Sequence, residues 1–517
     1  MYLGEPKTPE NEINVDLFHE ILIWPFRILG PQPDKDHEKP EDKVKRYVAQ
    51  LTATGKWKET GGVYELDTGV GKATKYAEFM YFYPFIREIL YGKTLAVLER
   101  TDVSAVEVDY LQAKLKSIRR ARLSVLRVNL YVTHFEVGIL VVELKDEKLP
   151  LDDVLAIQDQ FRRVYPPYWK ETLAGHCPNR VQWYQQATAA GPESDYTSMA
   201  THLDFTRQTK KSPMAAHWAW MVEPLVAEED EETVRNGTKD GKLYLEQLQD
   251  ERMPLMCYLA MDDPQKVGKG DQVRLCFCDG PGDWVLPYAS DFLKTFQERF
   301  CYDRFWQLEQ EYMTSRIFCC GYNFTVMGKS DPEFFLDDKS GMLAHFRHHY
   351  LHLGIVAHLH RAVLLVFSDR LSEAMQQKND ITDFNRRVQE IQKDLAEFMS
   401  GVWFFSVSSH MQGQDLFQAW SDHLGNRRLF EDVMQEVQTV GEILGTNLNE
   451  TRNKATLWLT QVATIGVALG VFIGFWGMSP NEVAKLFGTN PRLLWIVLGS
   501  ILLALLGGVA LAKWRKK

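Results

Sequence analysis

Two apolar runs near the C-terminal end constrain this chain more than any other feature. Residues 455–478 and 492–512 are rich in Leu, Val, Ile, Ala and Gly, and each is long enough to cross the ~30 Å hydrocarbon layer of a membrane as a helix. A short segment, 479–491, joins them, so we expect a hairpin of two transmembrane helices. The residues before the first run are expected to form the soluble part of the protein.

Basic residues beside the two runs predict how the hairpin is oriented. Arg452 and Lys454 precede the first run and the basic tail 513–517 follows the second, whereas the connecting side holds only Lys485 and Arg492. Because basic residues favour the cytoplasmic side, both ends of the chain are predicted to be cytoplasmic. Tryptophans near the ends of the runs fit interfacial aromatic belts: Trp458, Trp476, Trp495 and Trp514.

Composition narrows the class of protein. With 517 residues, 45% of them hydrophobic, the chain can form two or three domains with their own cores. A formal net charge of −10 gives no reason to expect nucleic acid as a direct partner. Seven cysteines without a signal pattern at the N-terminus favour a reducing cytosol over a disulfide framework, and their spacing favours buried apolar positions over a zinc site.

Residues 1–335 are predicted to be a mixed α/β cytoplasmic domain with the size of a sensor. Strands are expected at 124–145, as two adjacent strands, and at 254–262 and 316–328; helices are expected at about 73–91 and 152–164. The Pro-rich and charged segment 30–43 and the acidic segment 226–242 are expected to be exposed loops. The predicted fold class is therefore α+β for this part.

Residues 336–454 are predicted to be a helical stalk that continues into the first membrane span. Apolar residues recur there at steps of three and four, as on a helix that packs along a partner. The first series is Phe384, Val388, Ile391, Leu395, Phe398 and Val402, and the second is Leu429, Val433, Val437, Val440, Leu444 and Leu448.

A histidine-rich run, 345–360, holds the only weak candidates for a metal site. His345, His348, His349 and His352 are three and four residues apart, a helical spacing that can hold a metal ion. Nearby cysteines and an HExxH glutamate are absent, so packing, ligand contact or an interface is the preferred interpretation, and no metal is assigned. No nucleophile elbow, kinase signature or dinucleotide fingerprint occurs either, so no catalytic residues and no enzyme are predicted.

The first apolar run has distinct faces at ~100° per residue. A partly polar face is assigned to a pore wall: Asn453, Thr460, Thr464, Val467, Val471, Gly474 and Met478. Gly466 and Gly470 lie where another helix can approach closely. The alternative is a simple two-helix anchor, in which the Thr hydroxyls bond their own backbone.

The last 65 residues or so resemble the CorA family of divalent-cation transporters. The Gly-Met-Asn motif of that family stands here as Gly477, Met478 and Ser479, after the usual aromatic residue, Trp476, and with Asn453 at the inner end of the span. The resemblance implies a funnel-shaped homopentamer in the inner membrane of a bacterium or archaeon. First spans would line the pore, second spans would surround them, and the stalk and the α/β domain would control opening.

Ser479 is where the chain departs from the family. There, the asparagine presents a ring of amide oxygens to a hydrated magnesium ion. A ring of hydroxyls is shorter and also donates hydrogen bonds, so we expect a wider and less selective mouth. Asn481 is an alternative source of an amide. The predicted mouth thus comprises Gly477, Met478, Ser479 and Asn481, with magnesium or another divalent cation as the transported or regulatory ion.

Three further segments, 312–328, 348–374 and 404–420, resemble the CorA-like effectors found beside type III CRISPR systems. That resemblance implies antiviral defence, with a nucleotide second messenger as the ligand. In that group the messenger is a conjugate of S-adenosylmethionine and AMP, whose binding to the cytoplasmic domain would open the pore or disrupt the membrane.

Three functions follow from the sequence. The first is a ligand-gated CorA-like channel, the second a constitutive divalent-cation transporter gated by the ion itself, and the third a membrane-anchored binding protein that does not conduct.

Overall fold

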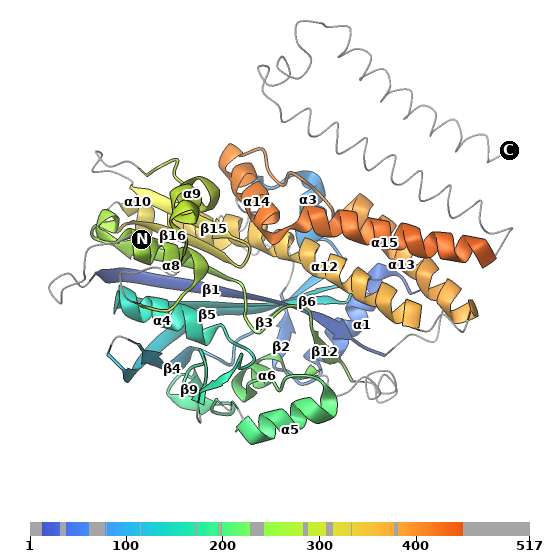
Figure 1. Cartoon of the computed structure of the whole chain (residues 1–517), viewed down its shortest axis with the longest axis horizontal. Coiled ribbons are helices and arrows are strands. Elements are labelled where there is room, and N and C mark those ends of the chain that lie inside the picture. Colours follow the sequence, from blue (N-terminus) through green and yellow to red (C-terminus); the bar gives the residue numbers. More distant parts are fainter. Residues whose placement is uncertain are drawn as a thin grey trace, which may run out of the picture. The chain divides into compact units, whose positions relative to one another are not determined.

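The computed structural model describes most of the chain before the two apolar runs. The described residues are 13–31, 38–60, 78, 80–113, 115–170, 173–194, 196, 199–227, 242–282, 288–306, 314–331, 333–376 and 381–447. They form a large β-sheet with many helices (Figure 1), which confirms the α+β class expected for this part. The two predicted transmembrane helices lie outside the described residues.

The bounds of the elements are as follows. The strands are β1 (Asn14–Leu29), β2 (Trp57–Glu59), β3 (Leu95–Arg100), β4 (Ala105–Gln112), β5 (Ser117–Thr133), β6 (Val137–Pro150), β7 (Trp169–Lys170), β8 (Leu173–Ala174), β9 (Arg180–Gln185), β10 (Thr188–Ala190), β11 (Val226–Ala227), β12 (Tyr244–Gln247), β13 (Leu255–Met261), β14 (Cys301–Tyr302), β15 (Ser315–Cys320) and β16 (Asn323–Lys329). The helices are α1 (Pro40–Thr52), α3 (Pro84–Tyr91), α4 (Leu151–Phe161), α5 (Met199–Thr209), α6 (Ala216–Val222), α8 (Lys269–Phe277), α9 (Ser290–Phe300), α10 (Glu333–Leu336), α11 (Met342–His345), α12 (Leu351–Gln376), α13 (Ile381–Gly401), α14 (Met411–Leu424) and α15 (Asn426–Asn447). A 3₁₀ turn, η2 (Pro264–Lys266), and a π-helical turn, η3 (Phe346–Tyr350), complete the described elements.

The main sheet holds fourteen strands in the described part of the chain. Its longest path runs β10-β9-β4-β5-β6-β1-β13-β16-β15-β14, with β12 also pairing β1 and β3 also pairing β5. Neighbouring strands are antiparallel except for β13 beside β16 and β11 beside β12. The hairpin β5–β6 confirms the two adjacent strands predicted at 124–145, and β15–β16 shows that 316–328 forms a hairpin as well.

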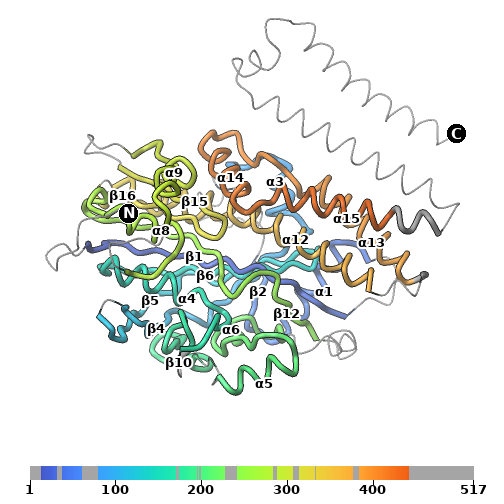
Figure 2. The backbone as a smooth tube through the Cα atoms, viewed as in Figure 1, coloured from blue at the N-terminus to red at the C-terminus, as the bar shows by residue number. Residues whose placement is uncertain are grey.

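Strand β1 lies at the centre of the sheet, between β6 and β13 (Figure 2). It is buried continuously from Leu17 to Ile28 because both faces of the sheet are covered there. Side chains alternate between the faces of a strand. Phe18 and Leu22 therefore join the core that includes α4, while His19 on the other face meets the ring of Phe346 in η3 at 6.0 Å between centroids.

The two helical covers differ in how they pack. Helix α4 begins directly after β6 and is buried almost all round, including its polar residues. On the other cover, Trp420 of α14 stacks on Phe324 of β16 with ring centroids 4.8 Å apart. Gly354 of α12 allows this close approach, since a Cβ atom at this position would lie 2.5 Å from the Trp420 ring.

One helical stretch in the described part of the chain, Met342–Gln376, is long and apolar enough to cross a membrane by length and composition. Within it, 83% of the most apolar window is buried inside the protein, as in the core helix of a compact domain.

The contacts divide the chain into two compact units. The first comprises the described residues up to Val366 together with Val407–Arg427, and the second comprises Phe367–Ser406 with the described residues from Arg428 onwards. This division differs from the boundary at 335/336 expected from the sequence. The reason is that the start of α12 and all of α14 belong to the unit that contains the sheet, whereas the two apolar series predicted for the stalk begin on α13 and α15, in the second unit.

Within the second unit, the apolar series predicted on α13 is confirmed. Phe384, Val388, Ile391, Leu395, Phe398 and Val402 are all buried, and so are Val433, Val437 and Val440 of α15. The Phe367 ring lies edge-on to Phe398, and Trp403 stacks on Phe430 with centroids 4.6 Å apart. Leu448 lies outside the described residues.

Several predicted boundaries shift in the structure. The loop expected at 30–43 gives way to α1 at Pro40, because proline suits the first turn of a helix. Of the helix expected at 73–91, the regular part is α3, which starts at Pro84. The acidic segment 226–242 starts with strand β11, and residues 228–241 lie outside the described residues.

The contact between Gly354 and Trp420 generates a first prediction. The substitution Gly354→Ala should lower the free energy of unfolding by ~1–3 kcal/mol, because overpacking a rigid ring outweighs the better helix propensity of alanine. Gly401→Ala, at the end of α13, is the control, since nothing lies within 4 Å of a Cβ atom there. Denaturant unfolding of the full-length chain measures both; equal stabilities would contradict the role given to Gly354.

Candidate functional site

The candidate site lies where η3 meets the central strands. A π-helical turn is rare and is often found at functional sites. Here it carries Arg347, His348 and His349, so the histidine-rich run singled out in the sequence coincides with the irregular turn. The turn sits between α11 and α12 and presents these polar side chains to groups on β1 and β6 and to Glu78.

Glu143 of β6 is the centre of the first polar cluster and is fully buried. Its Oε1 accepts hydrogen bonds from His19 Nε2 at 2.7 Å and from Arg347 Nε at 2.5 Å, and its Oε2 forms an ion pair with Arg127 Nη2 at 2.6 Å. A β-bulge between Val125 and Arg127 places the Arg127 backbone opposite Glu143. One carboxylate thus joins β1, β5, β6 and η3.

The charges around Glu143 decide its protonation state. Burial by itself would raise the pKa of Glu143, but Arg127, His19 and Arg347 outweigh it and hold the pKa well below the usual value. Burial lowers the pKa of His19 despite the nearby carboxylate. The cluster therefore contains a carboxylate that stays charged at neutral pH between two guanidinium groups, and it connects the elements that carry them.

Glu78 forms the second polar cluster, with two of the predicted histidines. Its Oε2 accepts from His348 Nδ1 at 2.9 Å, and its Oε1 accepts from Tyr91 Oη at 2.8 Å and lies 3.3 Å from His352 Nε2. His352 Nδ1 lies 2.7 Å from the His348 carbonyl oxygen, to which it can donate a hydrogen bond. Burial by itself would raise the pKa of Glu78. His352, His348 and Tyr91 together outweigh burial and lower the pKa to about 2.

The other two predicted histidines form a pair of their own. His345 and His349 approach with their Nδ1 atoms 2.7 Å apart, so one ring donates and the other accepts. Burial lowers the pKa of both, that of His349 to about 3, which keeps the rings neutral at pH 7. Tyr81 stacks between His349 and His410, with centroids 4.1 and 4.8 Å away, and makes a flat aromatic column.

The structure thus divides the four weak metal candidates into two pairs. His348 and His352 face Glu78, while His345 and His349 face each other. Among the described residues, no group of three or more His, Cys, Asp or Glu side chains is arranged to hold a metal ion.

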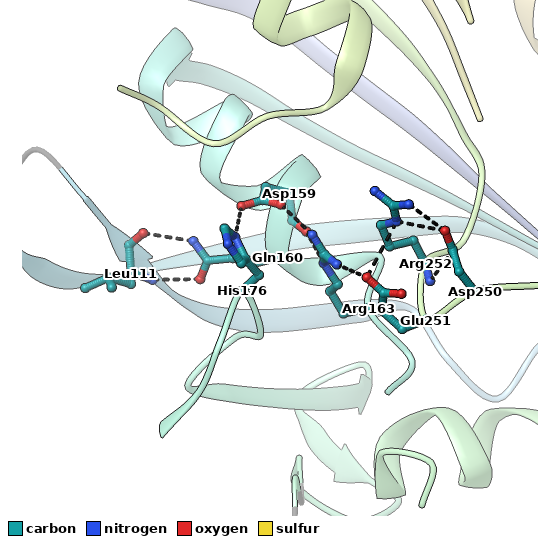
Figure 3. A network of polar contacts seen from close by, with 8 residues as sticks. All are labelled: Leu111, Asp159, Gln160, Arg163, His176, Asp250, Glu251 and Arg252. Carbon is teal, nitrogen blue, oxygen red and sulfur yellow. Dashed lines mark hydrogen bonds and ion pairs between the residues drawn. The ribbon is translucent and has the colours of Figure 1, made fainter. Parts of the chain in front are cut away.

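A third polar network runs along the end of α4 (Figure 3). Asp159 accepts from Arg163 Nη2 at 3.0 Å and from His176 Nδ1 at 2.7 Å, and Arg163 also pairs with Glu251. Gln160 bonds both the N–H and the C=O of Leu111. Each of these side chains has a partner, so the network fastens α4 to β4 and to the segment before β13.

The pore residues predicted from the sequence lie outside the described residues. These are Asn453, Thr460, Thr464, Gly466, Val467, Gly470, Val471, Gly474, Gly477, Met478, Ser479 and Asn481. The cysteine prediction can be followed: Cys276, Cys278, Cys319 and Cys320 are buried, which confirms that they occupy apolar positions.

Sequence reasoning missed the carboxylates that organise these clusters. A signal was present for Glu143, which is a lone acid inside the apolar run 137–144; Glu20 is likewise the only acid among the mostly apolar residues 17–29. A lone charge in a buried strand needs a partner or a function. Comparison with protein-family models, with curated proteins and with solved structures found no match to this chain.

Glu143 supplies a test of the first cluster. Glu143→Gln should destabilise the full-length chain by ~3–5 kcal/mol, because it removes the charge of a fully buried carboxylate from between the partly buried guanidinium groups of Arg127 and Arg347. Glu147→Gln is a matched control on the same strand, since Glu147 is exposed and pairs only with Lys145 on the surface. Denaturant unfolding would contradict the proposal if both variants lost less than ~1 kcal/mol.

Glu78 supplies a pH test. Its pKa falls from a usual value of 4.5 to about 2 on folding, so its contribution to stability is present above pH 4.5 and is lost as the pH falls toward 2. Glu78→Gln should therefore lower the melting temperature at pH 7, and the gap to the unmodified protein should narrow below pH 4.5. A gap that stays constant between pH 7 and pH 3.5 would show that the charge of Glu78 is not responsible.

Proposed function

We propose that this chain is a CorA-like, homo-oligomeric membrane channel for cations, opened by a ligand that binds its large α+β part. The observation that carries the proposal is the pair of apolar runs, 455–478 and 492–512, with Trp476, Gly477, Met478 and Ser479 where the first run meets the connecting loop. In this proposal the channel lies in the inner membrane of a bacterium or archaeon with both chain ends in the cytoplasm.

The helical elements support a route from the α+β part to the pore. Helix α15 reaches Asn447, and only residues 448–454 separate it from the first apolar run. Its buried stripe of Val433, Val437 and Val440 gives α15 one face that is packed and one that is exposed. A helix of this kind can transmit a displacement to the segment that follows it.

Control by a ligand is supported by the size of the part before the first apolar run and by its polar interior. An ion-gated transporter needs little more than a pore and a site for the ion, whereas this part buries charged clusters at Glu143, at Glu78 and along α4. The π-helical turn η3 connects two of these clusters with α12. In the proposal the ligand is a small nucleotide-type messenger and the biological role is antiviral defence.

Ser479 favours the ligand-gated channel over a constitutive magnesium transporter. Magnesium gives up its waters reluctantly, so a selective mouth must offer well-placed acceptors to the hydrated ion. A ring of serine hydroxyls is shorter than a ring of amides and gives a wider opening. A pore of this kind suits a channel that is closed until it is needed.

A flux measurement tests the proposal and generates the fourth prediction. Full-length protein in liposomes should pass cations only after a nucleotide ligand is added, and Ser479→Asn should raise the ratio of magnesium to sodium flux. The control is Thr489→Asn, which makes the same hydroxyl-to-amide change elsewhere in the loop and should leave the ratio unchanged.

The other outcomes separate the alternatives. Saturable magnesium flux without a nucleotide would instead support a transporter gated by the ion. Absence of flux under every condition, or a detergent-solubilised monomer, would leave an anchored binding protein, because one pore helix per chain needs several chains around an axis.

A further inference from the structure

Three polar side chains on the opposite face of the sheet from Glu143 carry buried atoms that have no hydrogen-bonding partner in the described part of the chain. They are Glu20 of β1, Gln158 of α4 and Arg162, the residue that caps α4, and all are at most 1% exposed. Both carboxylate oxygens of Glu20, both amide atoms of Gln158, and Nε and Nη1 of Arg162 are buried without a partner. Native proteins rarely leave even one such group unpaired.

Several observations place the three side chains together. Gln158 and Arg162 are four residues apart and share one face of α4. Glu20 stands directly opposite Cys257 in the pairing of β1 with β13, and Cys257 lies beside Gln158. The charge of Arg162 acts on the Glu20 carboxyl, but no ion pair within 4.0 Å joins them among the described residues. The thiol of Cys257 is too weak a partner to satisfy the Gln158 amide.

Burial makes it costly in free energy for these three side chains to lack hydrogen-bonding partners. Burial raises the pKa of Glu20 to about 8, although Arg162 opposes the shift. The neighbouring cluster on α4 shows the contrast, since Asp159 and Arg163 are fully paired (Figure 3). An acid, an amide and a guanidinium that are buried together without partners gain free energy from a ligand that supplies those partners.

The Arg162 end of the cluster lies next to partly exposed residues. The guanidinium of Arg162 lies 5.2 Å from the centre of the Tyr322 ring, in the turn between β15 and β16. Arg252 lies 5.4 Å from the same ring and has a side chain that is 32% exposed. The Arg162 end is thus the side of the cluster that lies nearest to partly exposed residues, and the thiols of Cys257 and Cys278 lie close to the cluster.

The donors and acceptors define the ligand. An ammonium group would donate to Glu20 and to the Gln158 oxygen, and a carboxylate would accept from Arg162 and from the Gln158 nitrogen. A group that carries both charges adds no net charge to the interior and leaves neither Glu20 nor Arg162 unpaired. We propose that Glu20, Gln158 and Arg162 form a binding site for the zwitterionic α-amino-acid head group of a small-molecule ligand.

A role of this site in gating rests on the proposed function as a ligand-gated channel. Binding of an amino-acid head group to the site does not depend on that function. If the head group is part of the gating ligand, filling the site joins β1 to α4 across the face of the sheet opposite η3. His19 and Glu20 are adjacent on β1, so one strand would then be fixed from both faces.

The test uses purified full-length protein in detergent and the twenty free L-amino acids as probes, each at millimolar concentration. At least one amino acid should raise the melting temperature and bind in calorimetry. For L-leucine the matched probes are isoamylamine, which lacks the carboxylate, and 4-methylpentanoate, which lacks the amine. Loss of either charge from a binding amino acid should weaken affinity about tenfold or more. Absence of binding by every amino acid overturns the inference.

Two variants separate a binding site from a structural cluster. Glu20→Met and Arg162→Met should each abolish amino-acid binding and raise the melting temperature of the ligand-free protein, because an apolar side chain replaces a buried polar group that has no hydrogen-bonding partner. A lower melting temperature for both would show that the charges stabilise the fold and would overturn the inference. Glu147→Gln, an exposed change on β6, should alter neither binding nor melting.

The same protein in liposomes distinguishes failure of this inference from failure of the proposed function. Binding of an amino acid to a protein that never conducts would leave the site in place and remove the channel. Nucleotide-dependent flux in a protein to which no amino acid binds would support the channel and overturn the amino-acid site.

Discussion

Strand β1 is the element on which the rest of the described structure depends, because it is buried on both faces and carries two ionisable residues side by side. His19 points to one face of the sheet and Glu20 to the other. On the His19 face, the carboxylate of Glu143 supplies a buried counter-charge that joins β1, β5, β6 and η3. On the Glu20 face, no equivalent partner is present in the described part of the chain.

This asymmetry gives the two faces different roles. A saturated ion cluster costs much to break, since removal of one member leaves another charge buried and unpaired. The Glu143 cluster is therefore suited to holding η3 and the start of α12 rigidly against the sheet. An unsaturated cluster gains most from a ligand that completes it. The Glu20 side of β1 is therefore the face where a small molecule would have the largest effect on the fold.

Patterns of period two and period 3.6 were sufficient to locate the strands β5 and β6, helix α4 and the buried stripe of α13. These patterns depend on neighbours a few residues away, so a single sequence contains them. The two compact units differ from the boundary expected at 335/336, because periodicity reports that a helix has a buried face but not what covers it. The start of α12 and Trp420 of α14 pack on the sheet, and no local signal separates this arrangement from a stalk.

The sequence by itself determined the element types, the two long apolar runs after residue 454 and the presence of lone acids within apolar strands. Only the tertiary structure decided which of those acids is paired, because the partners are far apart along the chain. Arg347 is 204 residues from Glu143, and His19 is 124 residues from it. Burial of Glu20 and Glu143 followed from their apolar neighbours. Their electrostatic environments differ because a different segment, distant in sequence, packs on each face of the sheet: η3 on the Glu143 face and α4 on the Glu20 face.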